Sequence, residues 1–265
     1  MKIFINTDME GVCAIVDWEE ASFKTGRGIG YIKNFLTGEV NAAIKGVLSV
    51  DKDAEIVVQD GHYGGYWGPN LIIEDLNPRA TLIQGKRGTE MIGFDGSFDL
   101  LLDIGAHSMA GTPKGLMNHT IAPHEIINFW INNMKVGEIG IRAAIAGHHG
   151  VSLGMVTGDY WAVEEARALL GDIEGVAVKK GLNMYTAECM NPYRAQDLIR
   201  EAAVKMMGRL KDFKAFKFDS PVEIKIEYAE TIMADRTELK SGAVRVDGRT
   251  IILSGDDLIQ TLNRL

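Results

Sequence analysis

Short, mostly apolar runs alternate with amphipathic segments through the first 170 residues of the chain. The apolar runs, typical of strands covered on both faces, occupy Lys2–Thr7, Glu55–Gln59 and residues 81–84, 100–105 and 151–157. Apolar residues recur every three or four positions over residues 36–48, 138–146 and 161–170, which is the period of a helix. Glycine-rich loops are expected at residues 26–30 and 61–68. This alternation predicts an α/β fold with a largely parallel sheet and helices on both faces.

The pattern changes near residue 190. Pro192 fits the first turn of a long helix that runs to about Leu210. The remaining segments predict a half-exposed strand, a pair of short strands and a terminal helix, at residues 222–228, 243–247 with 250–253, and 256–265. A hairpin is also predicted earlier, with Asn132-Asn133 as its turn between Ile126–Ile131 and residues 134–136. We therefore divide the chain into an α/β domain, residues 1–190, and a smaller α+β part, residues 191–265, packed on the first.

Composition narrows the class of protein. The 265 residues include 28 Lys and Arg against 36 Asp and Glu, a formal net charge of −8 that disfavours a nucleic-acid partner. The two cysteines, Cys13 and Cys189, have no CxxC spacing and are expected to be reduced thiols. No run approaches the ~18 apolar residues of a membrane span, and Asp8 interrupts any signal-peptide core. These features predict a soluble, cytoplasmic protein without a membrane partner.

Residue types that bind metals directly follow three of the predicted strands. Asp8 and Glu10 come after the first strand, His62 after the second and His107 after a later one, while Glu138 opens a helix. Because the carboxyl ends of parallel strands meet in one crevice, we expect these five side chains to converge. Carboxylates combined with imidazoles suit Zn²⁺, Mn²⁺ or Co²⁺ better than Ca²⁺. Asp8 is short and adjoins a buried strand, so it is the candidate to bridge two ions, whose natural chemistry is hydrolysis.

Each of these five residues also has an ordinary structural explanation. Asp8 can cap a turn, Glu10 can be a solvated loop charge, and Glu138 can complement the N-terminus of a helix. His62 and His107 can be hydrogen-bonded structural histidines. Taken singly, these explanations are the stronger ones. It is the placement of all five residues at strand ends and a helix start that favours a metal site.

Short motifs around these positions resemble those of a known family. They are Asp8-Met-Glu-Gly11, Asp60-Gly-His62, Gly105-Ala-His107, Thr112-Pro113, Asn118-His119-Thr120 and Val136-Gly-Glu138. In order and spacing they resemble the M55 family, the zinc D-aminopeptidases of the dipeptide-operon type. The similarity extends over nearly the whole chain and includes Gly158-Asp159 and Val178-Lys179.

The resemblance implies a site for two zinc ions in each subunit, with Mn²⁺ or Co²⁺ as alternatives. Asp8 would bridge the two ions. Glu10 and His62 would bind one ion, and His107 and Glu138 would bind the other. Residues 1–190 would then form the metal-binding catalytic domain, and residues 191–265 would take part in assembly.

The resemblance also implies the reaction and the assembly. His119 would be a further catalytic residue, acting either as a proton shuttle or as the attacking group. Asn118 and Asp159 are candidates for contact with the substrate or for support of the site. The implied activity is removal of N-terminal residues, particularly D-amino acids, from short peptides by a ring-shaped homo-oligomer.

Two other functions remain open at the level of the sequence. The same ligand types would serve an amidohydrolase or a dinuclear phosphoesterase, although the chain has no GxxxxGK[ST] phosphate loop. A non-catalytic, metal-stabilised binding subunit is the second alternative. Structural zinc is usually enclosed by four ligands that often include thiolates, and Cys13 and Cys189 lie outside the motifs.

Overall fold

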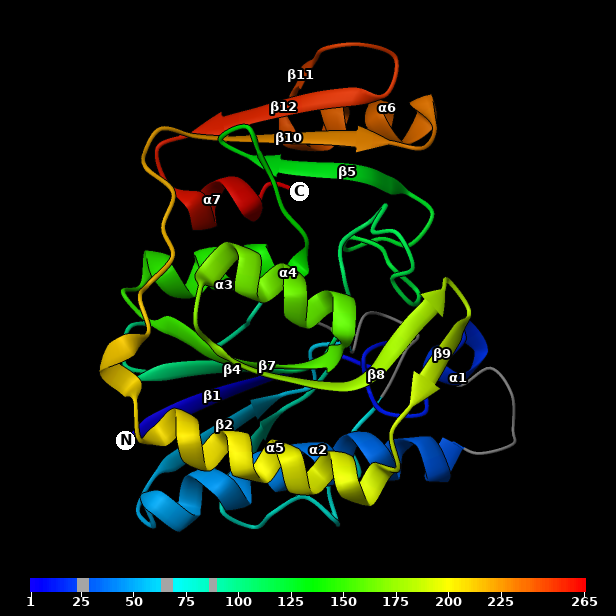
Figure 1. Cartoon of the computed structure of the whole chain (residues 1–265). Helices are drawn as coiled ribbons and strands as arrows, with labels where there is room; N and C mark the ends of the chain where they lie inside the picture. Colours follow the sequence, from blue (N-terminus) through cyan, green and yellow to red (C-terminus); the bar gives the residue numbers. More distant parts are fainter. Residues whose placement is uncertain (23–28, 63–68, 86–89) are drawn as a thin grey trace.

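The computed structural model describes residues 1–22, 29–62, 69–85 and 90–265, which form two sheets and their helices (Figure 1). The predicted glycine loops at 26–30 and 61–68 fall largely outside the described residues. Within the described residues, no helix combines the length and apolar content that a bilayer span requires.

The larger sheet has seven strands in the order β3-β2-β1-β4-β7-β8-β9. Neighbouring strands are parallel except at the edge, where β9 runs antiparallel to β8. The strands are β1 (Lys2–Thr7), β2 (Glu55–Gln59), β3 (Ala80–Ile83), β4 (Leu100–Ala106), β7 (Ser152–Asp159), β8 (Glu174–Asn183) and β9 (Thr186–Cys189).

Helices cover both faces of this sheet. On one face α2 (Ile29–Val50) packs against α5 (Pro192–Met207), and on the other lie α3 (Glu138–His148) and α4 (Tyr160–Leu170) (Figure 1). The central strand β4 is buried over its whole length, which explains why its sequence is apolar without alternation. The arrangement confirms the predicted α/β class.

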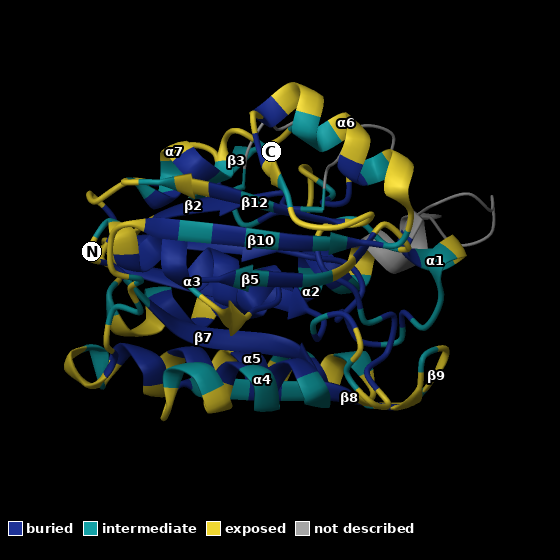
Figure 2. Cartoon of the chain, turned by 90° about the horizontal axis from the view of Figure 1, so that it is seen from above, coloured by how far each residue is buried: buried dark blue, intermediate teal, exposed yellow. Residues whose placement is uncertain are grey.

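The smaller sheet has five strands in the order β11-β12-β10-β5-β6, and all of its pairs are antiparallel. The strands are β5 (Ile126–Ile131), β6 (Met134–Lys135), β10 (Val222–Tyr228), β11 (Val244–Arg245) and β12 (Thr250–Gly255). Helix α7 (Leu258–Leu262) lies between this sheet and α3 (Figure 1). Helix α6 (Thr231–Ser241) packs on β10 and β12 and exposes most of its surface (Figure 2). A short 3-10 helix, η1 (Leu210–Asp212), follows α5.

The two sheets divide the chain differently from the predicted boundary near residue 190. Helix α5 lies beyond that boundary and packs on the larger sheet, against α2. Strands β5 and β6 lie before it and extend the smaller sheet through the pairing of β5 with β10. The hairpin turn itself forms as expected, with φ of 46° at Asn132 and 65° at Asn133. Half-exposed strands from distant parts of the sequence have paired with each other.

The order in which the chain adds strands to the larger sheet reverses at β1. From β1 the chain adds β2 and then β3 on one side, whereas β4, β7 and β8 follow on the other side. The crevice at the carboxyl ends of β1 and β4 is therefore a topological switch point, where ligands bind in open α/β sheets. Two of the predicted metal-ligating residues, Asp8 and His107, directly follow these two strands.

Candidate metal centre

The five predicted ligands meet at the switch point together with His119. The ligand atoms of Asp8, Glu10 and His107 lie within 4.8 Å of one another, as do those of His107, His119 and Glu138. His62 joins through Glu10, with its Nε2 3.2 Å from Glu10 Oε1. Asp8 and Glu138, 130 positions apart, have become neighbours because β1 ends and α3 begins at the same edge of the sheet.

Two glycines of the motifs are required by close backbone contacts. A Cβ on Gly11 would lie 2.0 Å from Ala106 O, and a Cβ on Gly61 would lie 2.4 Å from Thr7 O. Both distances are shorter than real Cβ contacts, so only glycine fits at either position. The loop after β1 can therefore pack closely on the end of β4, and the loop after β2 can pack closely on the end of β1.

Backbone carbonyls orient the two stacked imidazoles. The Nδ1 atom of His107 lies 3.0 Å from Ser108 O, and that of His119 lies 2.9 Å from Met117 O. A carbonyl oxygen can only accept, so Nδ1 carries a proton in both rings, and Nε2 is the nitrogen that faces the site. The ring centroids are 3.8 Å apart and nearly parallel, at 12°. Both Nε2 atoms approach Glu138 Oε1, at 3.3 Å for His107 and 3.5 Å for His119.

The two carboxylates nearest His107 are held by donors on both oxygens. Asp8 accepts from Met9 N (3.0 Å) on Oδ1 and from Arg142 Nη2 (2.9 Å) on Oδ2. Glu138 accepts from Ile121 N (2.7 Å) on Oε1 and from Arg142 Nη2 (2.7 Å) on Oε2. Their orientation is therefore set by the protein itself.

The segment that carries His119 has an unusual backbone. Four non-glycine residues have left-handed φ values: 65° at Lys114, 46° at Met117, 62° at Ile121 and 67° at His124. A positive φ is costly for a β-branched residue such as Ile121. Strain of this kind persists where the surrounding structure requires it, and it clusters at functional sites. Here it aims the Ile121 amide at Glu138.

Asn118 and Asp159 hold this segment in place. Asn118 accepts from Gly111 N and donates to Gly115 O, both at 2.8 Å. Asp159 accepts from Gly181 N (2.8 Å) and Leu116 N (3.2 Å). Asn118 is thus engaged with the backbone that precedes His119, and Asp159 joins that backbone to β8.

The pKa values of the clustered residues show that the site attracts positive charge. Burial opposes a charged imidazole at His62 and His107, yet the carboxylates of Glu10 and Glu138 raise the pKa of these histidines to about 9 and about 10. Burial is also the main cause that raises the pKa of Asp8 to about 7. Burial and the neighbouring His107 instead lower the pKa of His119 to about 4, which makes it neutral near pH 7.

The donor set fits divalent metal ions. Glu10 Oε2 and His107 Nε2 are buried and have no hydrogen-bond partner in the part of the chain that the structure describes. Buried polar atoms are nearly always satisfied, and a metal ion bound at this site would satisfy both of these atoms. Carboxylate oxygens and imidazole nitrogens are ligands for zinc and related ions, and binding would displace the protons that the crowded carboxylates attract.

Arg142 and Asp103 are parts of the site that the metal-ligand pattern did not reveal. Arg142 is 1% exposed and donates through Nη1 to both oxygens of Asp103, at 3.3 and 3.1 Å. Asp103, 0% exposed, also accepts from Asn6 Nδ2 at 2.8 Å. The sequence does contain a signal for them, because each is the one charged residue within a buried apolar stretch, 139–147 on α3 and β4. An ionised residue in such a stretch needs a buried partner.

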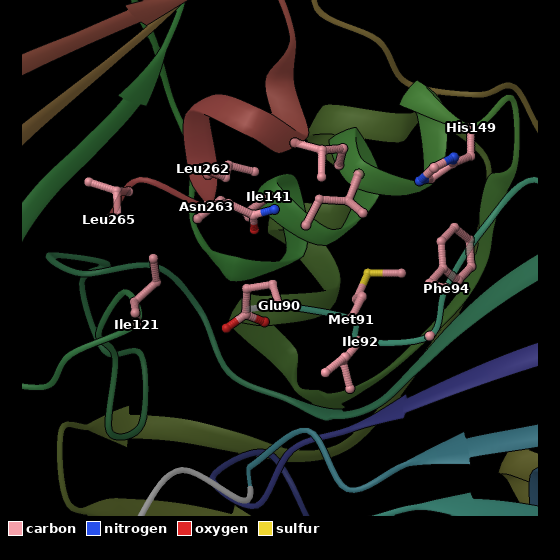
Figure 3. A pocket seen from close by; sticks show the side chains of 13 residues that line it. Glu90, Met91, Ile92, Phe94, Ile121, Ile141, His149, Leu262, Asn263 and Leu265 are labelled. Carbon is pink, nitrogen blue, oxygen red and sulfur yellow. The ribbon is translucent and has the colours of Figure 1, made fainter. Parts of the chain in front are cut away.

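A separate pocket of about 470 Å³ lies between α3 and α7. Figure 3 shows Ile141 of α3 beside Leu262 and Asn263 at the end of α7, with Glu90 and Met91 nearby. Its lining is mainly apolar and includes none of the six clustered residues. It adjoins the site only indirectly, since Glu90 Oε2 lies 3.8 Å from Arg142 Nε.

An α/β sheet with carboxylates and imidazoles gathered at its switch point defines a class, that of proteins with a candidate metal centre suited to hydrolysis. Comparison with known proteins gives the family. The profile of the family Peptidase_M55, described as D-aminopeptidase, matches residues 1–265, and the chain therefore belongs to this family. It is an aminopeptidase, a hydrolase that acts on peptide bonds.

Two relatives agree with this assignment. A D-aminopeptidase of Bacillus subtilis (strain 168) is 30% identical, in an alignment that covers 98% of this chain and 93% of the relative. A solved structure of the Zn-dependent D-aminopeptidase DppA from Bacillus subtilis, a self-compartmentalizing protease, has a TM-score of 0.92 and 28% identity. That match covers 100% of this chain and 95% of the solved chain.

Proposed function

We propose that the chain is a dinuclear, zinc-dependent aminopeptidase that removes N-terminal D-amino acids from short peptides. It would work in the cytoplasm as a ring-type homo-oligomer. The observation that carries the proposal is the meeting of three buried carboxylates with buried imidazoles at the switch point of a chain in the M55 family. The zinc dependence of the DppA structure supports the choice of metal.

The contacts within the cluster support a division of the ligands between two ions. Glu10 pairs with His62, and His107 pairs with Glu138, at 3.2 and 3.3 Å. Asp8 adjoins both pairs, since it groups with Glu10 and its Oδ2 lies 3.6 Å from His107 Nε2. Asp8 would accordingly bridge the ions. When bound, zinc lowers the pKa of coordinated water and polarises the carbonyl of the substrate.

His119 is the proposed catalytic residue. Its Nδ1 is fixed by Met117 O, and its neutral Nε2 faces the cluster beside Glu138. A neutral imidazole in this position can take a proton at Nε2 and return it to the leaving amine. The Trp18 ring, on α1 (Trp18–Ser22), packs against the His119 ring in a T-shaped arrangement, with 5.2 Å between centroids.

A panel of D- and L-dipeptides, amino-acid amides and phosphate esters tests the proposal on protein of measured metal content. We expect release of free amino acid, highest with N-terminal D-residues, that stops with a chelator and returns with Zn²⁺. Two zinc ions per chain are expected in the active form. A mass in sedimentation well above the 29.1 kDa of one chain is expected for the assembly.

The variant His119→Ala separates catalysis from metal binding. Loss of a general acid or base costs about 10²- to 10⁴-fold in turnover, so we expect that loss with the zinc content unchanged. His148→Ala is the matched control, because His148 pairs with Asp257 on the surface (3.3 Å) and should keep full activity. Turnover of phosphate esters with inert peptides would contradict the proposal, as would peptide hydrolysis that persists in chelator.

A further inference from the structure

Arg142 has no assigned role in the metal centre, yet it links the carboxylates on which that centre depends. A single nitrogen, Nη2, donates to Asp8 at 2.9 Å and to Glu138 at 2.7 Å. We propose that Arg142 is a positioning residue, whose guanidinium aligns these two carboxylates for metal before any ion arrives. The inference rests on the proposed function, because it assigns the residue that sets the zinc affinity of that site.

The hydrogen bonds leave room for an ion on every oxygen. A carboxylate oxygen has two lone pairs, and each oxygen of Asp8 and Glu138 receives one protein donor. One lone pair per oxygen thus remains for a metal. A carboxylate that is already held loses less rotational freedom when it binds, which raises metal affinity. The protein has fixed both side chains without occupying their ligand positions.

Arg142 can align other groups because it is itself anchored. Its Nη1 donates to both oxygens of Asp103, which is fixed by Asn6 across the β1–β4 pairing. The planar guanidinium therefore has one nitrogen on the anchor and one on the two ligands. A lysine ammonium is a point charge on a flexible chain and cannot reproduce this geometry.

A positive charge near a metal site would by itself weaken metal binding. Here the guanidinium charge is balanced by Asp103, which is buried and lies 3.1 Å from Nη1. Asp103 is in none of the groups of described residues placed to bind an ion, so its charge is available to Arg142. The repulsion between the buried pair and an incoming cation is small as a result, and the alignment of Asp8 and Glu138 dominates.

Zinc affinity of the metal-stripped full chain, measured by competition with a chromogenic chelator, tests the inference without any assay of turnover. Removal of an outer-shell partner typically costs 10- to 100-fold in metal affinity, and we expect a loss of that size in Arg142→Met. Arg142→Lys should lie between Arg142→Met and the wild type. Asp103→Asn should also weaken zinc binding, because it removes the charge that balances Arg142. The loss should be smaller than in Arg142→Met, because Arg142 keeps its donors on Asp8 and Glu138.

Arg209→Met is the matched control. Arg209 also donates to two acidic residues, Asp172 (2.6 Å) and Glu174 (2.9 Å), but it lies outside the metal centre. Its replacement should leave zinc affinity unchanged. The unfolding midpoint of each metal-free variant is recorded in parallel. If Arg142→Met does not fold, Arg142→Lys and Asp103→Asn make the same test.

The outcomes distinguish this inference from the proposed function. A wild-type chain that binds no zinc would overturn both. A wild-type chain that binds zinc, with the same affinity in all of the Arg142 variants, would overturn the positioning role alone. A lower unfolding midpoint with unchanged zinc affinity would do the same, because it would show that Arg142 only stabilises the fold. Weaker zinc binding in variants that remain folded is the expected result.

Discussion

The central strand β4 of the larger sheet and strand β10 of the smaller sheet place charged side chains in opposite environments. In the larger sheet, Asp103 of β4 points into the protein and is fully buried against Arg142. In β10 of the smaller sheet, apolar residues are buried and the charged residues between them, Glu223, Lys225 and Glu227, lie toward solvent. The central strand β4 of the larger sheet thus holds a charge inside the protein, where it needs a partner, while β10 of the smaller sheet leaves its charges toward water.

This difference shows that the buried charges near the candidate metal centre lower the stability of the fold. Buried ion pairs recover their desolvation cost only with good geometry, and replacing them by apolar residues is often neutral or stabilising. The larger sheet nevertheless gathers carboxylates, imidazoles and a guanidinium at one edge. The smaller sheet has the alternation expected of a surface that only has to pack on one side. Three substitutions sharpen this contrast, in order of decreasing effect.

The largest effect is expected from Asp103→Ala. The substitution leaves Arg142 buried without its anchor, and breaking a buried pair in this way costs about 3–5 kcal/mol. Urea unfolding of the metal-free chain measures the free energy of unfolding. A loss below about 1 kcal/mol, the range of exposed pairs, would mean that the charges of the two sheets do not differ energetically.

An intermediate effect is expected from Glu39→Gln on α2, and it should depend on pH. Burial raises the pKa of Glu39 from 4.5 to about 7. Between pH 4.5 and about pH 7, Glu39 is ionised in the unfolded chain but still protonated in the folded chain. The free energy of unfolding therefore falls as the pH rises through this window. The substituted glutamine keeps an acceptor for Cys13 N, which Glu39 now holds at 2.8 Å, but it cannot ionise.

The Glu39→Gln variant should therefore match the wild type near pH 4 and exceed it by about 3 kcal/mol near pH 8. Thermal or urea unfolding at the two pH values checks this. Equal free energies of unfolding of the two proteins at pH 8 would show that burial does not raise the pKa of Glu39.

The smallest effect is expected from Arg249→Ala in the smaller sheet. Arg249 is half exposed and pairs with Glu227 at 3.2 Å. Exposed pairs contribute about 0–1 kcal/mol and are screened by salt. Urea unfolding at low and high ionic strength should show a small loss that disappears with salt. A large loss that is insensitive to salt would place this pair with the buried charges of the larger sheet.

Much of the fold follows from patterns in the sequence. Strands β1, β2, β4 and β7 are apolar without alternation, because both of their faces are covered. The meeting of Asp8, His62 and His107 can be predicted for the same reason, since parallel strands share one carboxyl edge. The pairing of strands that are distant in the sequence is harder to predict. The pairing of β5 with β10, for example, has no signal in the local sequence of either strand.

Strand β8 shows why other elements are missed. It includes Lys179 and Lys180, which make the segment look polar and exposed. Lys179 is in fact 3% exposed, because its ammonium donates to the carbonyls of Glu10, Val12 and Ile15. Those carbonyls belong to a loop more than 160 positions away, so the partners that permit burial are invisible in the local sequence. Two of the acidic partners of Arg142, Asp8 and Asp103, are likewise distant in the sequence.

The placement of the cluster at the switch point has a consequence for biosynthesis. Its side chains come from the ends of β1, β2 and β4, from the loop between β4 and β5, and from the start of α3, with Asp8 first and Glu138 last in sequence. A nascent chain on the ribosome has no complete cluster until α3 has emerged and docked. A complete cluster thus requires that β1, β2 and β4 have paired and that α3 has docked on them, although β7 to β12 have still to be synthesised.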